Sequence, residues 1–244
     1  MKQFLPVFPF IAVFALLTAC SAQIAGVVRE DGSADITIQS GLLPSMTAII
    51  HSLFKTDGGA SQNIIDAKSI NASIGASKGV KTAHFRNITS SSIEGTISLF
   101  RVNDFLSVAG QRNQFLTFDP QNGRLLVVID RISAPRIVSL LSPDLVDYLS
   151  CLMSPAALED YQYIQTKAEY LDELQNFFGN FKDKKLAANL VSNIKEANIH
   201  ITVNFPKDVK SVQGGRFSGK RAEFDVPLLD LLAMETPLTY DVRW

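Results

Sequence analysis

Alternating apolar and polar positions predict strands at both ends of the chain. Residues 24–28 and 34–39 flank Asp31-Gly32, a dipeptide that favours a tight hairpin turn because both residues tolerate positive φ. Residues 199–205 and 238–244 alternate in the same way. We expect the last of these strands, which ends in Trp244, to be held within a sheet.

Helix and strand patterns follow one another between these ends. Met46, Ile49, Ile50, Leu53 and Phe54 recur at helical spacing and predict a helix that begins near Pro44. A weaker helix is predicted over 61–70. Strands are predicted over 80–88, 93–99, 115–118 and 125–130. The last pair encloses Gln121-Asn122-Gly123, a hairpin signal, and the wholly apolar run 125–129 predicts a strand covered on both faces.

Residues 135–197 have a helical character. Ser142-Pro143 and Ser154-Pro155 each pair a helix-capping residue with a proline suited to the first turn. Thr166-Lys167-Ala168-Glu169 fits a capping box. Beyond this block, 209–212 and 221–226 flank a glycine-rich turn, and 227–234 predicts a short helix. The fold class is therefore α+β, a single domain over 24–244 with an antiparallel-rich sheet packed against helices and a helical insertion at 135–197.

Composition excludes several classes of protein. The chain has 244 residues, 46% of them hydrophobic, and a net charge of −1. This balance argues against disorder, and a pI near 6.3 argues against a basic nucleic-acid binder. Two cysteines cannot form a disulfide scaffold. One of them, Cys151, lies among apolar residues and is expected to be a buried, inert thiol.

The N-terminus has the proportions of a signal peptide. Lys2 precedes an uncharged run from Phe4 to Leu17, which as a helix would measure about 21 Å. A bilayer core needs about 30 Å, and Pro6 and Pro9 weaken the run further. These features indicate an export signal rather than a membrane-spanning helix.

Leu17-Thr18-Ala19-Cys20 resembles the lipobox of bacterial lipoproteins. The resemblance implies cleavage after residue 19, with diacylglycerol and a further acyl chain such as palmitate on Cys20. Residues 20–23 would then form a short tether, reaching about 10 Å. We expect an exported protein anchored by these acyl chains to a membrane of the cell envelope, either the outer membrane or the periplasmic face of the inner membrane.

Two further stretches are similar to the LppM-type lipoprotein domain: an early strand around Val28-Arg29-Glu30-Asp31-Gly32, and Ile199 to Pro206 followed by Gly214-Gly215 and Ala222 to Leu228. That resemblance implies a sheet packed on helices and an apolar pocket for lipids or glycolipids. The helical block departs from the compact form of that domain. With Ser142-Pro143-Asp144-Leu145 and Glu169-Tyr170-Leu171, it resembles uncharacterised spirochaete lipoproteins.

No motif in the chain indicates catalysis. Gly214 and Gly219-Lys220 have P-loop spacing, but Arg221 follows where Ser or Thr would bind magnesium, and the next residues predict a strand. His51, His84 and His200 show no metal-ligand spacing. No G-x-S-x-G sequence is present. We therefore expect a non-enzymatic protein without a metal or cofactor, and a hydrolase has no positive support.

The helical block supplies a candidate binding site, because many of its residues are aromatic or large and aliphatic. Ordinary packing of helices on the sheet would also explain them. Our hypothesis is a pocket for an acyl chain or glycolipid. Its expected lining is Leu145, Leu149, Leu152, Tyr170, Leu174, Phe177 and Phe178. The alternative function is a structural or assembly subunit that docks another envelope protein through an exposed apolar patch.

Overall fold

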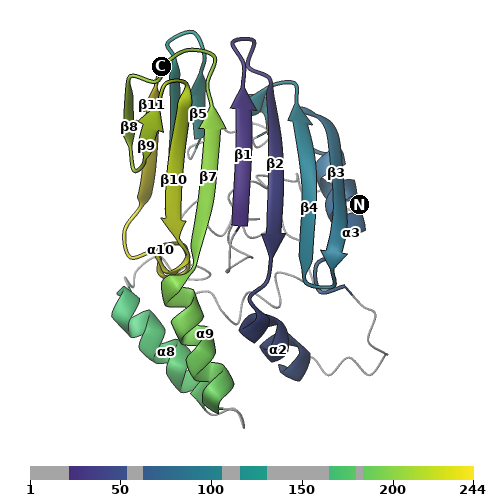
Figure 1. Ribbon diagram of the computed structural model, residues 1–244, viewed down its shortest axis with the longest axis vertical. Helices are drawn as coiled ribbons and strands as arrows, with labels where there is room; N and C mark the ends of the chain where they lie inside the picture. Colours follow the sequence, from purple (N-terminus) through teal and green to yellow (C-terminus); the bar gives the residue numbers. More distant parts are fainter. Residues whose placement is uncertain (1–21, 54–62, 106–115, 131–164, 180–183) are drawn as a thin grey trace, which may run out of the picture.

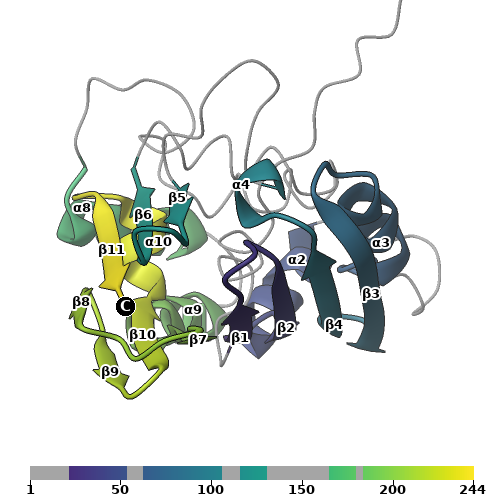
Figure 2. The same ribbon diagram turned by 90° about the horizontal axis from the view of Figure 1, so that it is seen from above.

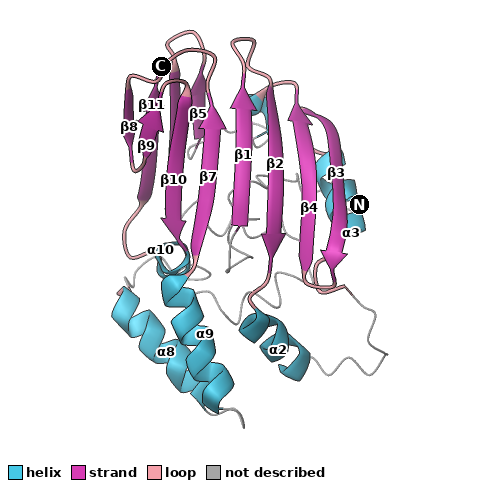
Figure 3. Ribbon diagram, in the orientation of Figure 1, coloured by secondary structure: helices cyan, strands magenta, loops and turns pink. Residues whose placement is uncertain are grey.

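The computed structural model describes residues 22–53, 63–105, 116–130, 165–179 and 184–244. Within these residues the chain forms two β-sheets and several helices, with strands in two blocks separated by helices (Figures 1 and 3). Nearly all strand pairs are antiparallel. This arrangement confirms the predicted α+β class. The N-terminal run and the lipobox lie outside the described residues.

The larger sheet has seven strands in the order β3-β4-β2-β1-β7-β10-β9. Its central pair, β1 and β7, is parallel, with Ile24 opposite Ile201 and Gly26 opposite Val203. This pairing joins the start of the described chain to a strand near its end. The strands are β1 (Ala22–Val28), β2 (Ala34–Gly41), β3 (Val80–Thr89), β4 (Ser92–Leu99), β7 (Asn198–Asn204), β9 (Arg216–Ser218) and β10 (Arg221–Pro227).

The smaller sheet has four strands in the order β5-β6-β11-β8. They are β5 (Leu116–Asp119), β6 (Arg124–Ile129), β8 (Ser211–Gln213) and β11 (Leu238–Arg243). Seen from above, β5, β6 and β11 lie over the β7–β10 part of the larger sheet (Figure 2). The two sheets thus form layers with apolar side chains between them.

The helices cover the ends of the sheets and part of one face. α2, α8 and α9 gather at the lower end in Figure 1, and α9 contacts both of the others. α3 packs against β3, on the same side of the larger sheet as the smaller sheet (Figure 2). The helices are α2 (Pro44–Leu53), α3 (Ala67–Gly75), α4 (Val102–Phe105), α8 (Lys167–Gly179), α9 (Lys184–Glu196) and α10 (Leu228–Ala233).

Most locally encoded elements agree with the sequence predictions. The β1–β2 and β5–β6 hairpins, α2, α10 and the final strand are present. Strand β11 lies between β6 and β8, and the adjoining Trp244 is 4% exposed. In the insertion predicted over 135–197, α8 and α9 are observed, whereas 135–164 lies outside the described residues.

Three local predictions need correction. The helix expected over 61–70 begins at Ala67, because Asp66 caps it by accepting hydrogen bonds from the backbone N–H groups of Lys68 and Ser69. Residues 209–212 do not pair with β10, since β8 pairs with β11 and β10 pairs with β9. Strand β6 is interior to its sheet but only half-buried along most of its length, so it is not covered on both faces.

Candidate functional site

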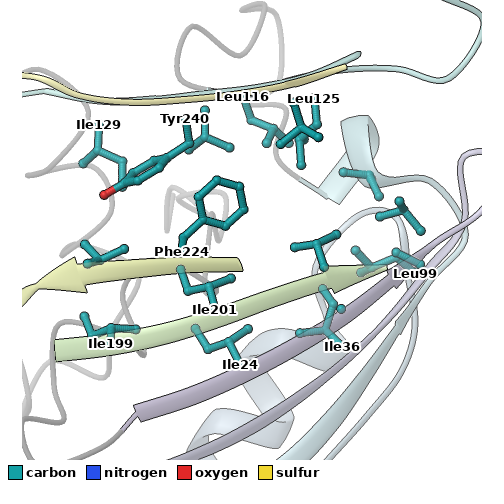
Figure 4. A pocket seen from close by; sticks show the side chains of 18 of the residues that line it. Ile24, Ile36, Leu99, Leu116, Leu125, Ile129, Ile199, Ile201, Phe224 and Tyr240 are labelled. Atoms are coloured by element: carbon teal, nitrogen blue, oxygen red, sulfur yellow. The ribbon is translucent and has the colours of Figure 1, made fainter. Parts of the chain in front are cut away.

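An apolar cavity of about 170 Å³ lies between the two sheets (Figure 4). The larger sheet supplies one wall through β1, β2, β7 and β10, and the smaller sheet supplies the other through β5, β6 and β11. Its lining is Ile24, Gly26, Val28, Ala34, Ile36, Leu99, Val102, Leu116, Leu125, Val127, Ile129, Ile199, Ile201, Val203, Phe224, Val226, Leu231, Tyr240 and Val242.

Strand alternation places these residues in the cavity wall. On β1, Ile24 and Val28 are buried, whereas the intervening Ala25 and Val27 point to the exposed outer face. On β7, Ile199, Ile201 and Val203 line the cavity in the same way. The parallel pairing brings the two sets side by side and produces a continuous apolar wall.

Gly26 leaves its position in this wall without a side chain. A Cβ atom built at Gly26 would come no nearer than 3.9 Å to Val203, so the position has room for a larger residue. Its neighbours across the sheet are Ile36 and Val203, which are both large and apolar. The glycine therefore contributes to the hollow, because its own position lacks the side chain that would fill part of it.

Tyr240 supplies the polar side-chain atom of this lining. Its ring packs edge-on against Phe224 of the opposite sheet, with 5.3 Å between the ring centroids. The Tyr240 hydroxyl points to the end of the cavity where Ile129 and Ile199 lie (Figure 4). Burial and the negative charge of Asp230 together raise the pKa of Tyr240 to about 12, so this hydroxyl is neutral and can donate a hydrogen bond at physiological pH.

The residues expected to line a pocket in the helical block lie elsewhere. Tyr170, Leu174 and Phe178 are buried in the hydrophobic core, and burial raises the pKa of Tyr170. Phe177 is 51% exposed and packs edge-on against Phe178. None of these four residues lines the inter-sheet cavity. Leu145, Leu149 and Leu152 lie outside the described residues, as does Cys151.

In the sequence, the residues that line the cavity follow the ordinary alternation of strands. The sequence pattern that could have indicated the cavity is the alternation at Ile24, Gly26 and Val28, together with that at Ile199, Ile201 and Val203. A glycine at an inward position of a buried strand is unusual, since it gives up both packing and strand propensity. Recognising the hollow also required the β1–β7 pairing, which no local pattern reveals.

The outer face of the larger sheet carries His200, one of the three histidines without metal-ligand spacing, together with charged side chains of the neighbouring strands. His200 Nδ1 lies 2.7 Å from Asp225 Oδ1, and Arg216 Nη1 lies 2.9 Å from Asp225 Oδ2. Hydrogen bonds from His200 and Arg216 hold the pKa of Asp225 below its usual range. These groups pair across neighbouring strands on an exposed surface. Within the described ranges, no cluster of three metal-ligating side chains occurs.

Gly219 and Lys220 form the turn of a hairpin rather than a P-loop. They connect β9 to β10, and Gly219 has φ = 54°. The segment that follows is a strand, so no helix N-terminus is available there to bind phosphate. In the part of the chain that the structure describes, none of the helices has the length and hydropathy needed to cross a bilayer.

Comparison with known proteins finds one similarity. No family model matches the chain. No curated protein matches it either. Among solved structures, the chain is similar to the NMR structure of the folded domain of the Mycobacterium tuberculosis protein LppM. The two share 10% sequence identity and a TM-score of 0.34, with coverage of 100% of this chain and 95% of that one. The fold class described above therefore rests on the observed strand pairing.

Proposed function

We propose that this chain is a non-enzymatic envelope lipoprotein whose inter-sheet cavity takes up the apolar part of a lipid. The observation that carries the proposal is a cavity lined almost wholly by aliphatic and aromatic side chains. Binding sites for small apolar ligands have this character. The lipobox-like Leu17-Thr18-Ala19-Cys20 supports a membrane anchor on Cys20, which would place the cavity close to a supply of lipid.

The cavity volume bounds the ligand. An apolar cavity of about 150 Å³ in a protein interior stays dry and binds benzene. The present cavity, at about 170 Å³, therefore holds an apolar group of at least that size, and because it is partly open, a longer ligand can project from it. The end of an acyl or prenyl chain fits this requirement. A polar or charged group would lose its hydration without gaining partners along most of the lining.

The alternative role as a subunit held by an envelope protein has less support. Among the described residues, the large apolar side chains that are exposed come from separate elements. They are Val27, Ile88, Phe100, Phe177 and Phe217. Within this part of the chain, their distribution over β1, β3, the residue after β4, α8 and β9 does not make one continuous docking patch.

Filling the cavity tests the lipid-binding proposal. The probe is N-phenyl-1-naphthylamine, a neutral apolar dye whose fluorescence rises in apolar surroundings. Gly26→Leu should place an isobutyl group in the hollow and weaken dye binding at least tenfold while the protein stays folded. Ala25→Leu is the matched control, because it adds the same group one residue away on the exposed face. Unchanged dye affinity in a folded Gly26→Leu protein would overturn the proposal, and the protein-partner role would then take precedence.

A further inference from the structure

One side-chain polar group, the Tyr240 hydroxyl, lies at an end of the otherwise apolar cavity (Figure 4). Apart from Tyr240, the lining consists of Gly, Ala, Val, Leu, Ile and Phe residues, whose side chains have no hydrogen-bonding atom. The Tyr240 hydroxyl lies at the end marked by Ile129 and Ile199 (Figure 4). The polar head of an amphiphile bound in this cavity can therefore form a hydrogen bond with the Tyr240 hydroxyl at this end.

An ion pair between Asp230 and Lys167 lies near the Tyr240 end of the cavity. Asp230 of α10 directly precedes Leu231, which lines the cavity. The Asp230 carboxylate forms a salt bridge of 2.7 Å with Lys167 Nζ at the start of α8. Its negative charge opposes ionisation of the Tyr240 hydroxyl. The apolar lining around that hydroxyl would penalise a carboxylate or phosphate more than an uncharged head, because a charged group loses more hydration there.

The opposite end, where Leu99 lies, is lined by apolar groups (Figure 4). Leu99 and Val102 lie there with Leu116, and the buried Phe105 completes the short helix α4. Asn103 fixes α4 to β5, because its side-chain amide bonds to both the carbonyl (2.6 Å) and the N–H (3.1 Å) of Phe118. This end offers a bound ligand aliphatic contacts and suits the terminal methyl of a chain.

We infer that the cavity selects a single-chain amphiphile with an uncharged, hydrogen-bonding head, such as a fatty alcohol or a monoacylglycerol. The head accepts a hydrogen bond from Tyr240, and the chain runs toward Leu99 and Val102. This inference rests on the proposed lipid-binding function. It adds a chemical class of ligand and a direction of binding.

Displacement of the bound dye from the full chain tests the inference. The competitors are 1-decanol, 1-monodecanoylglycerol and decanoate at pH 8, where decanoate is ionised. We expect both neutral amphiphiles to displace the dye at concentrations at least tenfold lower than decanoate. Tyr240→Phe should weaken displacement by decanol about fivefold without changing dye affinity, since one hydrogen bond contributes about 1 kcal/mol.

Two controls separate the inference from the proposed function. Thr239→Val removes a hydroxyl from the neighbouring position of β11, on the opposite face, and should change none of these values. If the dye binds but decanoate competes as well as decanol, or if Tyr240→Phe leaves displacement by decanol unchanged, the inference is overturned and the apolar site stands. If the wild-type protein binds no dye, the proposed function itself is overturned.

Discussion

Two asparagine side chains, Asn71 and Asn87, form hydrogen bonds to backbone groups where α3 meets β3. The Asn71 amide donates to the Phe85 carbonyl at 2.9 Å and accepts from the Phe85 N–H at 2.7 Å, which joins α3 to the outer edge of β3. Asn87 bonds in the same manner to the backbone of Ile65 and Ala67. The Asn71 bonds engage both backbone groups of Phe85 on an edge strand, and the Asn87 bonds hold the start of α3 against the same strand.

Loss of the Asn71 amide should destabilise the fold. In Asn71→Ala, both backbone groups of Phe85 lose their hydrogen bonds to α3, and each such bond contributes about 1 kcal/mol. We expect the free energy of unfolding to fall by about 2 kcal/mol, measured by urea denaturation. Asn189→Ala on the exposed surface of α9 is the control and should have little effect. A change within about 0.5 kcal/mol for Asn71→Ala would contradict this role.

Helix boundaries show which elements the sequence can specify. The capping box predicted at the start of α8 is present: the Thr166 backbone N–H donates to Glu169 Oε2 at 2.8 Å, and the Glu169 N–H donates to Thr166 Oγ1 at 3.2 Å. Both partners lie within four residues, so the spacing alone identifies them. The start of α3 is also specified by a residue next to it, the N-cap Asp66, and the sequence prediction overlooked this cap.

Removing the cap should weaken α8. Thr166→Ala leaves the Glu169 N–H without its side-chain acceptor, and loss of an N-cap costs about 1 kcal/mol. We expect a decrease of that size in the free energy of unfolding, whereas Thr166→Ser should retain most of the stability because its hydroxyl can still accept. Equal stability of the alanine and serine variants would show that the capping bond does not contribute.

Pairings between distant strands could not be predicted in this way. Strand β8 follows β7 closely in sequence, yet it pairs with β11 through Val212 and Val242. The parallel β1–β7 pair joins Ala22 to Ile199 across the helical block. An alternating pattern specifies which face of a strand is apolar but not which strand lies beside it. The cavity was missed for this reason, since its walls come from strands far apart in the chain.

At the scale of the whole molecule, the inter-sheet layer balances packing against a hollow. Ile24, Ile199 and Val226 are almost fully buried, yet the Gly26 position between the sheets is left unfilled. Empty apolar volume reduces stability because the surrounding atoms lose contacts. A ligand that fills the hollow restores those contacts. The cost of keeping this space open is consistent with a binding role for it.

Trp244 links the two sheets and can report whether they unfold together. It is the chain's single tryptophan and is 4% exposed. Its ring lies 5.8 Å from that of Phe118 on β5 and 4.7 Å from that of Phe205, the residue after β7 (centroid distances). Burial in this aromatic contact predicts blue-shifted native emission that moves to the red when the contact is broken.

If the contact joins the sheets into one cooperative unit, the urea transition followed by Trp244 emission should coincide with that followed by far-ultraviolet circular dichroism. Trp244→Ala should lower the free energy of unfolding by about 3–5 kcal/mol, measured by circular dichroism, because a large buried aromatic group is lost. A fluorescence midpoint clearly below the circular dichroism midpoint would show instead that the smaller sheet separates first, with the inter-sheet cavity lost before the larger sheet unfolds.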